Sequence, residues 1–416
     1  MYLYFLLIRI AALFGHKKAR LLVRGQAETL KVLTAKRPDS TSGLIWLHAA
    51  SVGEFEQARP LIERLRSEQP QRRIIVTFFS PSGYEMRKNY NQADGVYYLP
   101  FATRRNARRF LDALQPDMAI FVKYEFWPAY LRELKKRNIP TYSISAIFRP
   151  EQLFFRPWGK AHLALLNCFT HIYVQDEASL RLLQSHGVTH TSVAGDTRFD
   201  RMAEVTSHPK QIPVIEQFTA GCDRVIVAGS TWPEDEQLLA EFISSLPTGE
   251  GGGRGSKLIL VPHEIDEKHL HQIFEMFEGR MVRFTRATPV NIRHTQVLVV
   301  DTMGLLSSIY PYGQAAYIGG GFGVGIHNTI EAAAYGMPVI FGPNYHHFRE
   351  AKGLIAAGAA ESISNYTELE QALTRALDNH AEMGAKAAAY VRSELGATDK
   401  IYNELFNHQP PGQPVV

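Results

Sequence analysis

Glu54 lies where an apolar run gives way to an amphipathic helix, in the stretch LIWLHAASVGEFEQARPLIERL (residues 44–65). Its neighbours Ala50, Ser51 and Gly53 are small and leave room for a bulky substrate beside the carboxylate. A carboxylate in such a position can act as a general base that takes a proton from a hydroxyl group. It can equally be an ordinary acidic residue of a first helical turn, which only stabilises the helix start. We expect the helix start to keep Glu54 ionised near neutral pH.

A glycine-rich stretch, YIGGGFGVGIHNTIEAAAYGMPVIFGP (residues 317–343), joins a predicted strand to a helix expected to begin near Asn328. Glycines allow the backbone to approach a ligand closely, and the start of a helix attracts phosphate. The dinucleotide fingerprint does not fit, because six residues counted from Gly321 end in isoleucine, and no Walker loop follows. A tight structural turn is the alternative interpretation of these glycines.

Glu331 is the acidic residue of this second stretch, three positions after Asn328. That spacing places both side chains at the same end of the expected helix. The carboxylate can accept hydrogen bonds from the ribose of a nucleotide. Alternatively, the two residues form a capping pair.

Apolar runs that alternate with helical stretches must position these residues. The runs of the first half are LIWLHA, RRIIVTFF, GVYYLP, MAIFVKY, TYSISA, HIYVQ and TSVAG, and those of the second half are RVIVAGS, SKLILVP, MVRFT, QVLVVD, AAYIGG and PVIFG. Such alternation is typical of a parallel sheet covered by helices on both faces. We therefore predict an α/β protein with two Rossmann-like, doubly wound domains that face a central cleft. Ligands of such sheets bind at the carboxyl ends of the strands, as suits a transferase with two substrates.

The alternation pauses at EVTSHPKQIPV (residues 204–214), which holds two prolines and marks the expected domain boundary. The expected division is an N-terminal helix over residues 1–25, a first domain over 26–205, a second domain over 206–407 and a disordered tail over 408–416.

Composition indicates the cellular setting of the protein and argues against a nucleic acid as its partner. The chain has 416 residues, a net charge of +4 and two cysteines, Cys168 and Cys222. Two cysteines cannot build a disulfide framework, which favours a reducing cytosolic setting. The charge is spread along the chain and no nucleic-acid-binding motif occurs, so a nucleic acid is not an expected partner.

The N-terminal segment MYLYFLLIRIAALFGHKKARLLVRGQ suggests contact with a membrane. Its apolar part, residues 1–14, is too short to span a bilayer and is interrupted by Arg9. Basic residues follow the apolar part, the reverse of a signal peptide. We predict a helix that lies in the cytoplasmic face of a membrane, with a core-packed first helix as the alternative.

Taken together, several motifs resemble those of the 3-deoxy-D-manno-oct-2-ulosonic acid (Kdo) transferases, a family of GT-B glycosyltransferases. The motifs are HAASVGE, VKYEFWP, GDTRFD, LVP, VVDTMG and HNTIEAAAYGMPVIFGP. The resemblance implies inverting transfer of Kdo from CMP-Kdo to the lipid A precursor lipid IVA, in lipopolysaccharide biosynthesis. It also implies a location at the cytoplasmic side of the inner membrane, as a peripheral or monotopic protein, and no cofactor. A GT-B transferase or epimerase that acts on a UDP-sugar is the alternative.

The resemblance also implies roles for individual residues. Glu54 would be the catalytic base, and Lys123 and Arg198 would be charged residues of the active site. The implied CMP contacts are Pro262, His263, Met303, Gly304, Leu305, Asn328, Thr329, Ile330 and Glu331.

Four positions depart from the family's pattern. The family commonly has an acid at Lys123, a lysine at Arg198, an arginine at His263 and a glutamate at Leu305. Glu125, two residues on and on the same strand face, either inherits the role of the missing acid or that role differs here.

The expected reaction needs no metal, because the sequence has no Asp-x-Asp pair to hold one. The donor and the acceptor are both anions. The basic run RRNARR (residues 104–109), with Lys17, Lys18 and Arg20, could hold such anions or could form a solvated helix face.

Overall fold

The structure is a computed structural model that describes residues 2–35, 43–207, 209–246, 256–277, 279–292 and 295–407, without the side chains of Tyr2 and Leu3. The chain forms two compact units. The first combines the residues up to Arg201 with those from Leu395 onward, and the second is Met202–Glu394.

The first unit contains a parallel sheet of seven strands in the order β3-β2-β1-β4-β5-β6-β7. Strands β1 and β4 are neighbours at the point where the winding direction reverses, which is where ligands bind in such sheets. The strands are β1 (Leu44–Ala49), β2 (Arg73–Phe78), β3 (Gly95–Tyr98), β4 (Met118–Val122), β5 (Thr141–Ala146), β6 (His171–Val174) and β7 (Thr191–Val193).

Helices cover both faces of this sheet. Successive side chains of a strand point to opposite faces, so each strand contributes to a core on either side. Trp46 of β1 packs with Phe110 and Tyr130 in one core, whereas Ile45 packs with Phe55 in the other. Helices α5 and α6 therefore cover one face and α3 the other. The helices are α3 (Val52–Glu68), α4 (Pro81–Arg87), α5 (Arg104–Leu114), α6 (Pro128–Lys136), α7 (Lys160–Leu166) and α8 (Glu177–Ser185). Helix α9 (Thr197–Ser207) begins in this unit and continues beyond Arg201 into the second.

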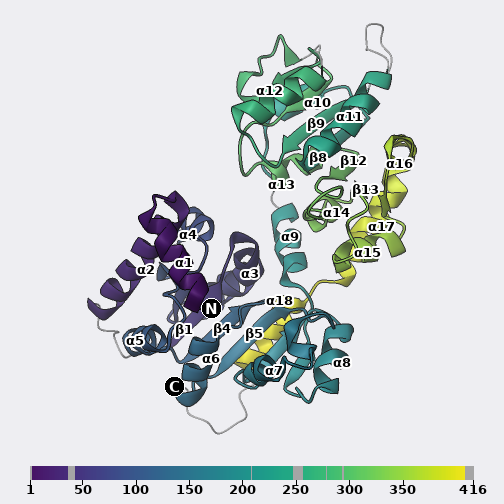
Figure 1. The fold of residues 1–416 in the computed structure, drawn as a ribbon. Helices are drawn as coiled ribbons and strands as arrows, with labels where there is room; N and C mark the ends of the chain where they lie inside the picture. Colours follow the sequence, from purple (N-terminus) through teal and green to yellow (C-terminus); the bar gives the residue numbers. More distant parts are fainter. Residues whose placement is uncertain are drawn as a thin grey trace. The chain divides into compact units, whose positions relative to one another are not determined.

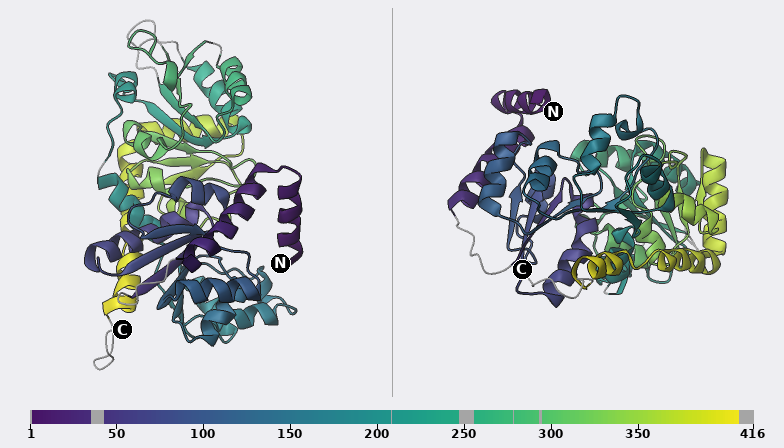
Figure 2. Two further views of the ribbon diagram at one scale, coloured as in Figure 1. Left: turned by 90° about the vertical axis from the view of Figure 1, so that its left-hand side faces the viewer. Right: turned by 90° about the horizontal axis from the view of Figure 1, so that it is seen from below.

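The N-terminal segment forms two helices where we expected one over residues 1–25. Helices α1 (Tyr2–Leu13) and α2 (Lys17–Ala35) pack side by side (Figures 1 and 2). The chain turns between them at Gly15, whose φ of 94° is readily adopted only by glycine. That glycine is the physical reason why a single helix does not form.

The last described segment returns to the first unit, so the domain division differs from the expected one. In α18 (Ala397–Tyr402), Asp399 forms an ion pair with Arg64 of α3. The carboxylate of Asp200 accepts hydrogen bonds from the backbone N–H groups of Gly396 (2.8 Å) and Thr398 (2.7 Å). These contacts tie the segment to the first unit, which itself ends at residue 201 and not at 205. The tail expected over 408–416 lies outside the described residues.

The second unit contains another parallel sheet of seven strands, in the order β10-β11-β9-β8-β12-β13-β14. Its strands are β8 (Val225–Thr231), β9 (Lys257–Pro262), β10 (Met281–Arg283), β11 (Val297–Val299), β12 (Ala315–Ile318), β13 (Val339–Phe341) and β14 (Ala360–Ser362). Its helices are α10 (Pro213–Thr219), α11 (Pro233–Ser245), α12 (Glu267–Met276), α13 (Leu306–Ile309), α14 (Ile330–Ala334), α15 (Arg349–Ala356), α16 (Tyr366–Asp378) and α17 (His380–Ser393). The prediction of two doubly wound α/β domains is confirmed.

Candidate functional site

Helix α3 begins directly after the carboxyl end of β1 and carries Glu54 in its first turn. The Ser51 hydroxyl caps the helix by accepting a hydrogen bond from the backbone N–H of Glu54 (3.4 Å). The Oε2 of Glu54 accepts a hydrogen bond from the backbone N–H of Ala50 (2.6 Å). Glu54 is thus a capping residue, as the alternative interpretation held. The backbone N–H of Ser51 also interacts with this carboxylate and, like that of Ala50, favours its charged form.

The ionisation of Glu54 differs from the expectation. Burial, and then the negative charge of Glu125, raise the pKa of Glu54 to about 7. The N–H of Ala50 and the ammonium of Lys123 act in the opposite direction and are outweighed. The expectation of a fully ionised carboxylate near neutral pH is therefore wrong, because desolvation exceeds the effect of the helix start. A pKa close to the working pH is, however, the value that suits a general base.

Glu125 belongs to a hydrogen-bonded network beside Glu54. Its Oε2 lies 3.1 Å from the Nε2 of His48 and accepts a hydrogen bond from the indole N–H of Trp127. His48 is fully buried in β1, and its Nδ1 lies 3.0 Å from the carbonyl oxygen of Thr77. The same Nδ1 lies 2.9 Å from the hydroxyl oxygen of Thr77, and the indole N–H of Trp127 also donates to Nε2 of His48 (3.0 Å). The network holds the Glu125 carboxylate in a fixed place.

Lys123 lies in the turn after β4 with a φ of 58°, in the left-handed region that favours glycine. The strand ends at Val122, so the argument that Lys123 and Glu125 share a strand face is wrong. The Lys123 ammonium lies 5.2 Å from the centre of the Tyr124 ring, and its charge lowers the pKa of Glu54. The structure therefore brings Lys123, Glu125 and Glu54 together as one group of interacting charges.

Arg198 lies at the start of α9 and holds the buried Asp196. Its Nε donates a hydrogen bond of 2.8 Å to Oδ2 of Asp196. Burial opposes the charge of Asp196, but the guanidinium of Arg198 outweighs it and lowers the pKa of that carboxyl. Gln57 of α3, one turn after Glu54, donates a hydrogen bond of 3.0 Å to Oδ1 of Asp196. The Arg198 segment is thus tied to the helix that carries Glu54.

In the second unit, three aromatic rings stack after neighbouring strands. The His263 ring, after β9, lies 4.8 Å from the Trp232 ring, after β8, and 4.5 Å from the His327 ring, after β12. The indole N–H of Trp232 donates a hydrogen bond of 3.2 Å to Nε2 of His327. Burial, and then the charge of His263, lower the pKa of His327 to about 4, so its ring is neutral near pH 7. A pocket of about 230 Å³ opens beside Trp232 and His263.

Sequence reasoning predicted His263 but missed Trp232 and His327. Both carry the same signal as the residues that it found, because each follows a predicted strand directly or after the glycine-rich turn. An aromatic residue at the carboxyl end of a parallel strand is therefore a usable signal in such a sheet.

Asn328 and Glu331 form the capping-type pair that was the alternative interpretation. The Asn328 side-chain N–H₂ donates a hydrogen bond of 2.9 Å to Oε1 of Glu331, and its Oδ1 accepts one of 3.1 Å from the N–H of Ile330. Helix α14 begins at Ile330, two residues later than expected, and has five residues. Thr329 and Ile330, between the two residues of this pair, are fully buried.

The glycine cluster is explained by close packing of the backbone. A Cβ on Gly321 would lie 2.5 Å from the Cα of Gly342, and Gly320 has a φ of 90°. The carboxylate of Asp235 fixes this loop by accepting hydrogen bonds from the N–H of Gly320 (2.8 Å) and of Trp232 (2.9 Å). The tight structural turn is thus the interpretation that the geometry supports.

The remaining predicted CMP contacts lie at the carboxyl end of β9 and after β11. Pro262 is the last residue of β9, and Met303, Gly304 and Leu305 form the turn that leads from β11 to α13. Gly304 has a φ of 83°, and the Met303 side chain is 70% exposed. Because β11, β9, β8 and β12 are consecutive in the sheet, all the predicted CMP contacts follow the carboxyl ends of neighbouring strands.

Comparisons with known proteins agree with the resemblance found in the sequence. Residues 23–201 match the family model described as 3-deoxy-D-manno-octulosonic-acid transferase (kdotransferase). Curated relatives named 3-deoxy-D-manno-octulosonic acid transferase include one from Aquifex aeolicus, 28% identical over 85% of this chain and 91% of its own length. One from Chlamydia trachomatis is 26% identical over 87% of this chain and 85% of its own length. The resemblance to the Kdo transferase family is confirmed.

Solved structures show the same fold at low sequence identity. UDP-GlcNAc 2-epimerase from Neisseria meningitidis has a TM-score of 0.62 at 15% identity and covers 88% of this chain and 100% of its own. MurG from Acinetobacter baumannii has a TM-score of 0.53 at 12% identity, again over 88% and 100%. The GT-B class is confirmed, and identities this low carry no statement on substrate.

Proposed function

We propose that this chain, a relative of the Kdo transferases, transfers Kdo from CMP-Kdo to the lipid A precursor lipid IVA in lipopolysaccharide biosynthesis. The observation that carries the proposal is the position of Glu54. It lies in the unit that matches the family model, at the carboxyl end of β1, with a pKa of about 7. That is the arrangement of a base that accepts the proton of a sugar hydroxyl.

The proposed reaction is a single displacement that inverts the anomeric carbon of Kdo. The acceptor hydroxyl oxygen attacks that carbon, its proton passes to Oε1 of Glu54, and the bond from the carbon to the phosphate oxygen breaks. CMP leaves with the electron pair as a phosphate monoester. One base on the acceptor side suffices, and no covalent sugar intermediate or metal is needed. Turnover that EDTA abolishes and magnesium restores would contradict the metal-independent step.

Lys123 and Arg198 are proposed to act on the anionic donor. Kdo is a carboxylic acid, and the departing phosphate gains negative charge, so nearby cations stabilise the transition state. The Lys123 ammonium already affects Glu54 electrostatically, and the guanidinium of Arg198 is held by Asp196 close to α3. We assign both residues as catalytic groups.

The second unit is proposed to bind the CMP part of the donor. Its stacked rings, Trp232, His263 and His327, offer flat aromatic faces of the kind on which a nucleobase packs. The Glu331 carboxylate, oriented by Asn328, can accept hydrogen bonds from ribose hydroxyls. The proposed contacts are Pro262, His263, Met303, Gly304, Leu305, Asn328, Thr329, Ile330 and Glu331.

Helix α1 is proposed to hold the protein on the cytoplasmic face of the inner membrane. Phe5 is buried against Phe101, but Leu7, Leu13 and Phe14 are between 55% and 87% exposed. Exposed apolar side chains followed by lysines favour the interface of an anionic membrane. Among the described residues, no helix combines the length and apolar character needed to cross a bilayer.

Mass spectrometry of the product tests the function. Purified protein is incubated with CMP-Kdo and tetraacyl lipid A precursor, and the acceptor should gain the mass of a Kdo residue, that is, of Kdo less one water. A parallel reaction with UDP-sugars tests the alternative of a UDP-sugar transferase or epimerase. Turnover of a UDP-sugar without turnover of CMP-Kdo would overturn the proposal.

A further inference from the structure

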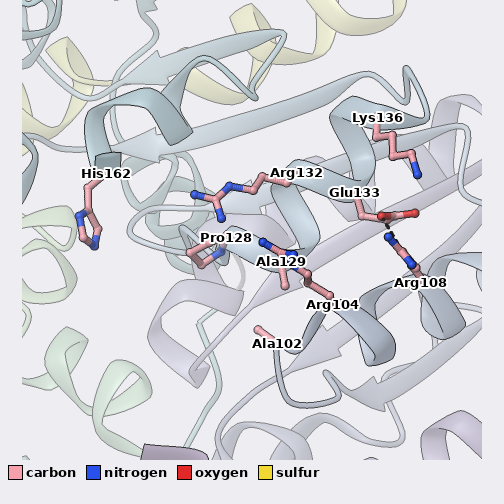
Figure 3. Close-up of a pocket in the computed structure, with 9 residues that line it drawn as sticks. All are labelled: Ala102, Arg104, Arg108, Pro128, Ala129, Arg132, Glu133, Lys136 and His162. Carbon is pink, nitrogen blue, oxygen red and sulfur yellow. Dashed lines mark ion pairs between the residues drawn. The ribbon is translucent and has the colours of Figure 1, made fainter. Parts of the chain in front are cut away.

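A basic pocket opens on the first unit between α5, α6 and α7, with a volume of about 680 Å³ (Figure 3). Arg104 and Arg108 of α5 face it from one side, and Arg132 and Lys136 of α6 from the other. We infer that this pocket binds a phosphate monoester on the sugar headgroup of the glycolipid acceptor. The inference rests on the proposed function and assigns the pocket to the acceptor.

The charges of this pocket are poorly balanced within the protein. Its lining holds four cations and one carboxylate, that of Glu133. Glu133 is shared, because Arg108 lies 3.5 Å from it and Arg137 lies 3.0 Å from it. Among the described residues, the side chains of Arg104, Arg132 and Lys136 make no ion pair or hydrogen bond. Three cations are therefore left to attract an anion from solution.

The positions of the cations favour an anion-binding pocket over a solvated helix face, the two interpretations of the basic run. Residues four apart on a helix share a face, and like charges at this spacing repel each other. Here two such pairs, on two helices that pack together, converge on one hollow. Arg105 and Arg109 lie on the same helix as Arg104 but do not line the hollow. A phosphate would offset the repulsion, and the planar guanidinium matches its oxygens in a bidentate manner.

The pocket lies next to the proposed catalytic network. Pro128 and Ala129 line it and directly follow Trp127, whose indole N–H binds the Glu125 carboxylate. A phosphate bound there would therefore sit on the same side of the unit as the residues that act on the acceptor hydroxyl.

An open, mainly apolar pocket of about 490 Å³ adjoins the basic pocket. His162 lines both pockets, and Phe126 and Phe154 line the apolar one. An amphiphile with a phosphorylated sugar and acyl chains fits this combination, whereas a free anion would use only the basic part.

The test compares two double variants that remove the same charge from the same region. Arg104→Ala with Arg132→Ala removes two cations of the pocket, and Arg105→Ala with Arg109→Ala removes two cations outside it. Transfer is measured to the bisphosphorylated acceptor and to the same lipid without phosphates. We expect the pocket variant to raise KM for the phosphorylated acceptor at least tenfold, with kcat nearly unchanged. KM for the dephosphorylated acceptor, already high for the wild type, should not change.

Other results would overturn the inference. An equal loss on both acceptors would indicate a structural effect, and an equal loss in the control variant would indicate general electrostatic attraction. Reduced binding to phosphatidylglycerol vesicles without acceptor, at unchanged KM, would assign the pocket to membrane phospholipids.

A direct binding measurement separates this inference from the proposed function. Nanodiscs that contain the phosphorylated or the dephosphorylated acceptor are bound to the wild type and to both variants. If no Kdo transfer occurs at all, the proposed function fails. The pocket then still stands if its variant alone loses the preference for phosphorylated nanodiscs, and it falls if the wild type shows no such preference.

Discussion

The carboxylate of Glu125 lies 3.1 Å from Nε2 of the buried His48, and its charge contributes to the raised pKa of Glu54. The hydrogen bonds that hold Glu125 in place thus also affect the pKa of Glu54, although Glu125 and Glu54 share no hydrogen bond. A negative charge held beside a base keeps that base ready to accept a proton at neutral pH. In this chain the charge of Glu125 helps to raise the pKa of Glu54, whereas the charge of the neighbouring Lys123 lowers it.

Glu125→Gln should shift the pH dependence of transfer to lower pH. Burial would still raise the pKa of Glu54, but the second cause, the Glu125 charge, would be gone. The active form is the deprotonated carboxylate, so the wild-type rate should rise through about pH 7 and then level off. The rising limb of Glu125→Gln should lie at lower pH, and that of Lys123→Met at higher pH. Rate profiles between pH 5 and 9 measure both, and coincident limbs would contradict the coupling.

Glu54→Gln should reduce transfer by about 10²–10⁴-fold, the usual weight of a general base. Glutamine keeps an oxygen for the N–H of Ala50, so the helix start and the melting temperature should be nearly unchanged. Glu68→Gln, at the opposite end of α3, is the matched control and should keep full activity. Steady-state rates and CMP calorimetry decide the matter, because near-normal turnover of Glu54→Gln would leave Glu54 with capping alone.

The strands could be predicted from the sequence because parallel strands buried on both faces form continuous apolar runs. All seven strands of the first sheet coincide with predicted runs. In the second sheet β14 was missed, since its three residues, Ala-Glu-Ser, have no apolar pattern. The break at Gly15 was also missed. An isolated glycine in a helical pattern can lie within the helix or mark its end, and the sequence alone does not distinguish the two.

The sequence predicted where the site residues lie in the fold, but it did not predict the pKa of Glu54. Glu54 and the Asn328–Glu331 pair lie where strand-to-helix turns place them. The pKa of Glu54 depends instead on burial, which only the packed domain supplies, and then on Glu125, seventy-one positions later. The return of α18 to the first unit likewise depends on contacts between distant residues, such as Asp200 and Thr398.

Replacing Leu6, Leu7 and Leu13 by serine should weaken membrane association without unfolding the protein. These side chains are exposed, so their loss removes apolar area from the proposed membrane contact and not from the core. Phe5→Ala is the contrasting variant, because Phe5 is buried and its loss should cost on the order of 3 kcal/mol of stability. Flotation with anionic liposomes measures the first effect and thermal unfolding the second. Unchanged flotation of the triple variant would remove the role of α1.

His327 should make the protein less stable as the pH falls. The pKa of His327 is about 4 in the folded protein, against an ordinary value of 6.5, so the unfolded chain binds the proton first. Stability is therefore fully present above pH 6.5 and is lost progressively as the pH falls towards 4. The loss should be about 1–2 kcal/mol, given the partial exposure of the ring. Urea unfolding of the wild type and of His327→Gln at pH 7 and 5 tests this, and an equal pH dependence would refute it.

Glu331→Ala should weaken CMP binding, because a ribose hydroxyl would lose its acceptor at a cost of about 1–3 kcal/mol. The structure adds a way to separate this role from capping. Asn328 donates to Oε1 of Glu331 and independently accepts from the N–H of Ile330, so its contact with the helix start survives the substitution. The melting temperature should therefore change little while the affinity falls. Glu370→Ala, an exposed acid of α16 in the same unit, is the control for the loss of one charge. Calorimetry with CMP measures the affinity, and an unchanged dissociation constant would mean that Glu331 serves only to pair with Asn328.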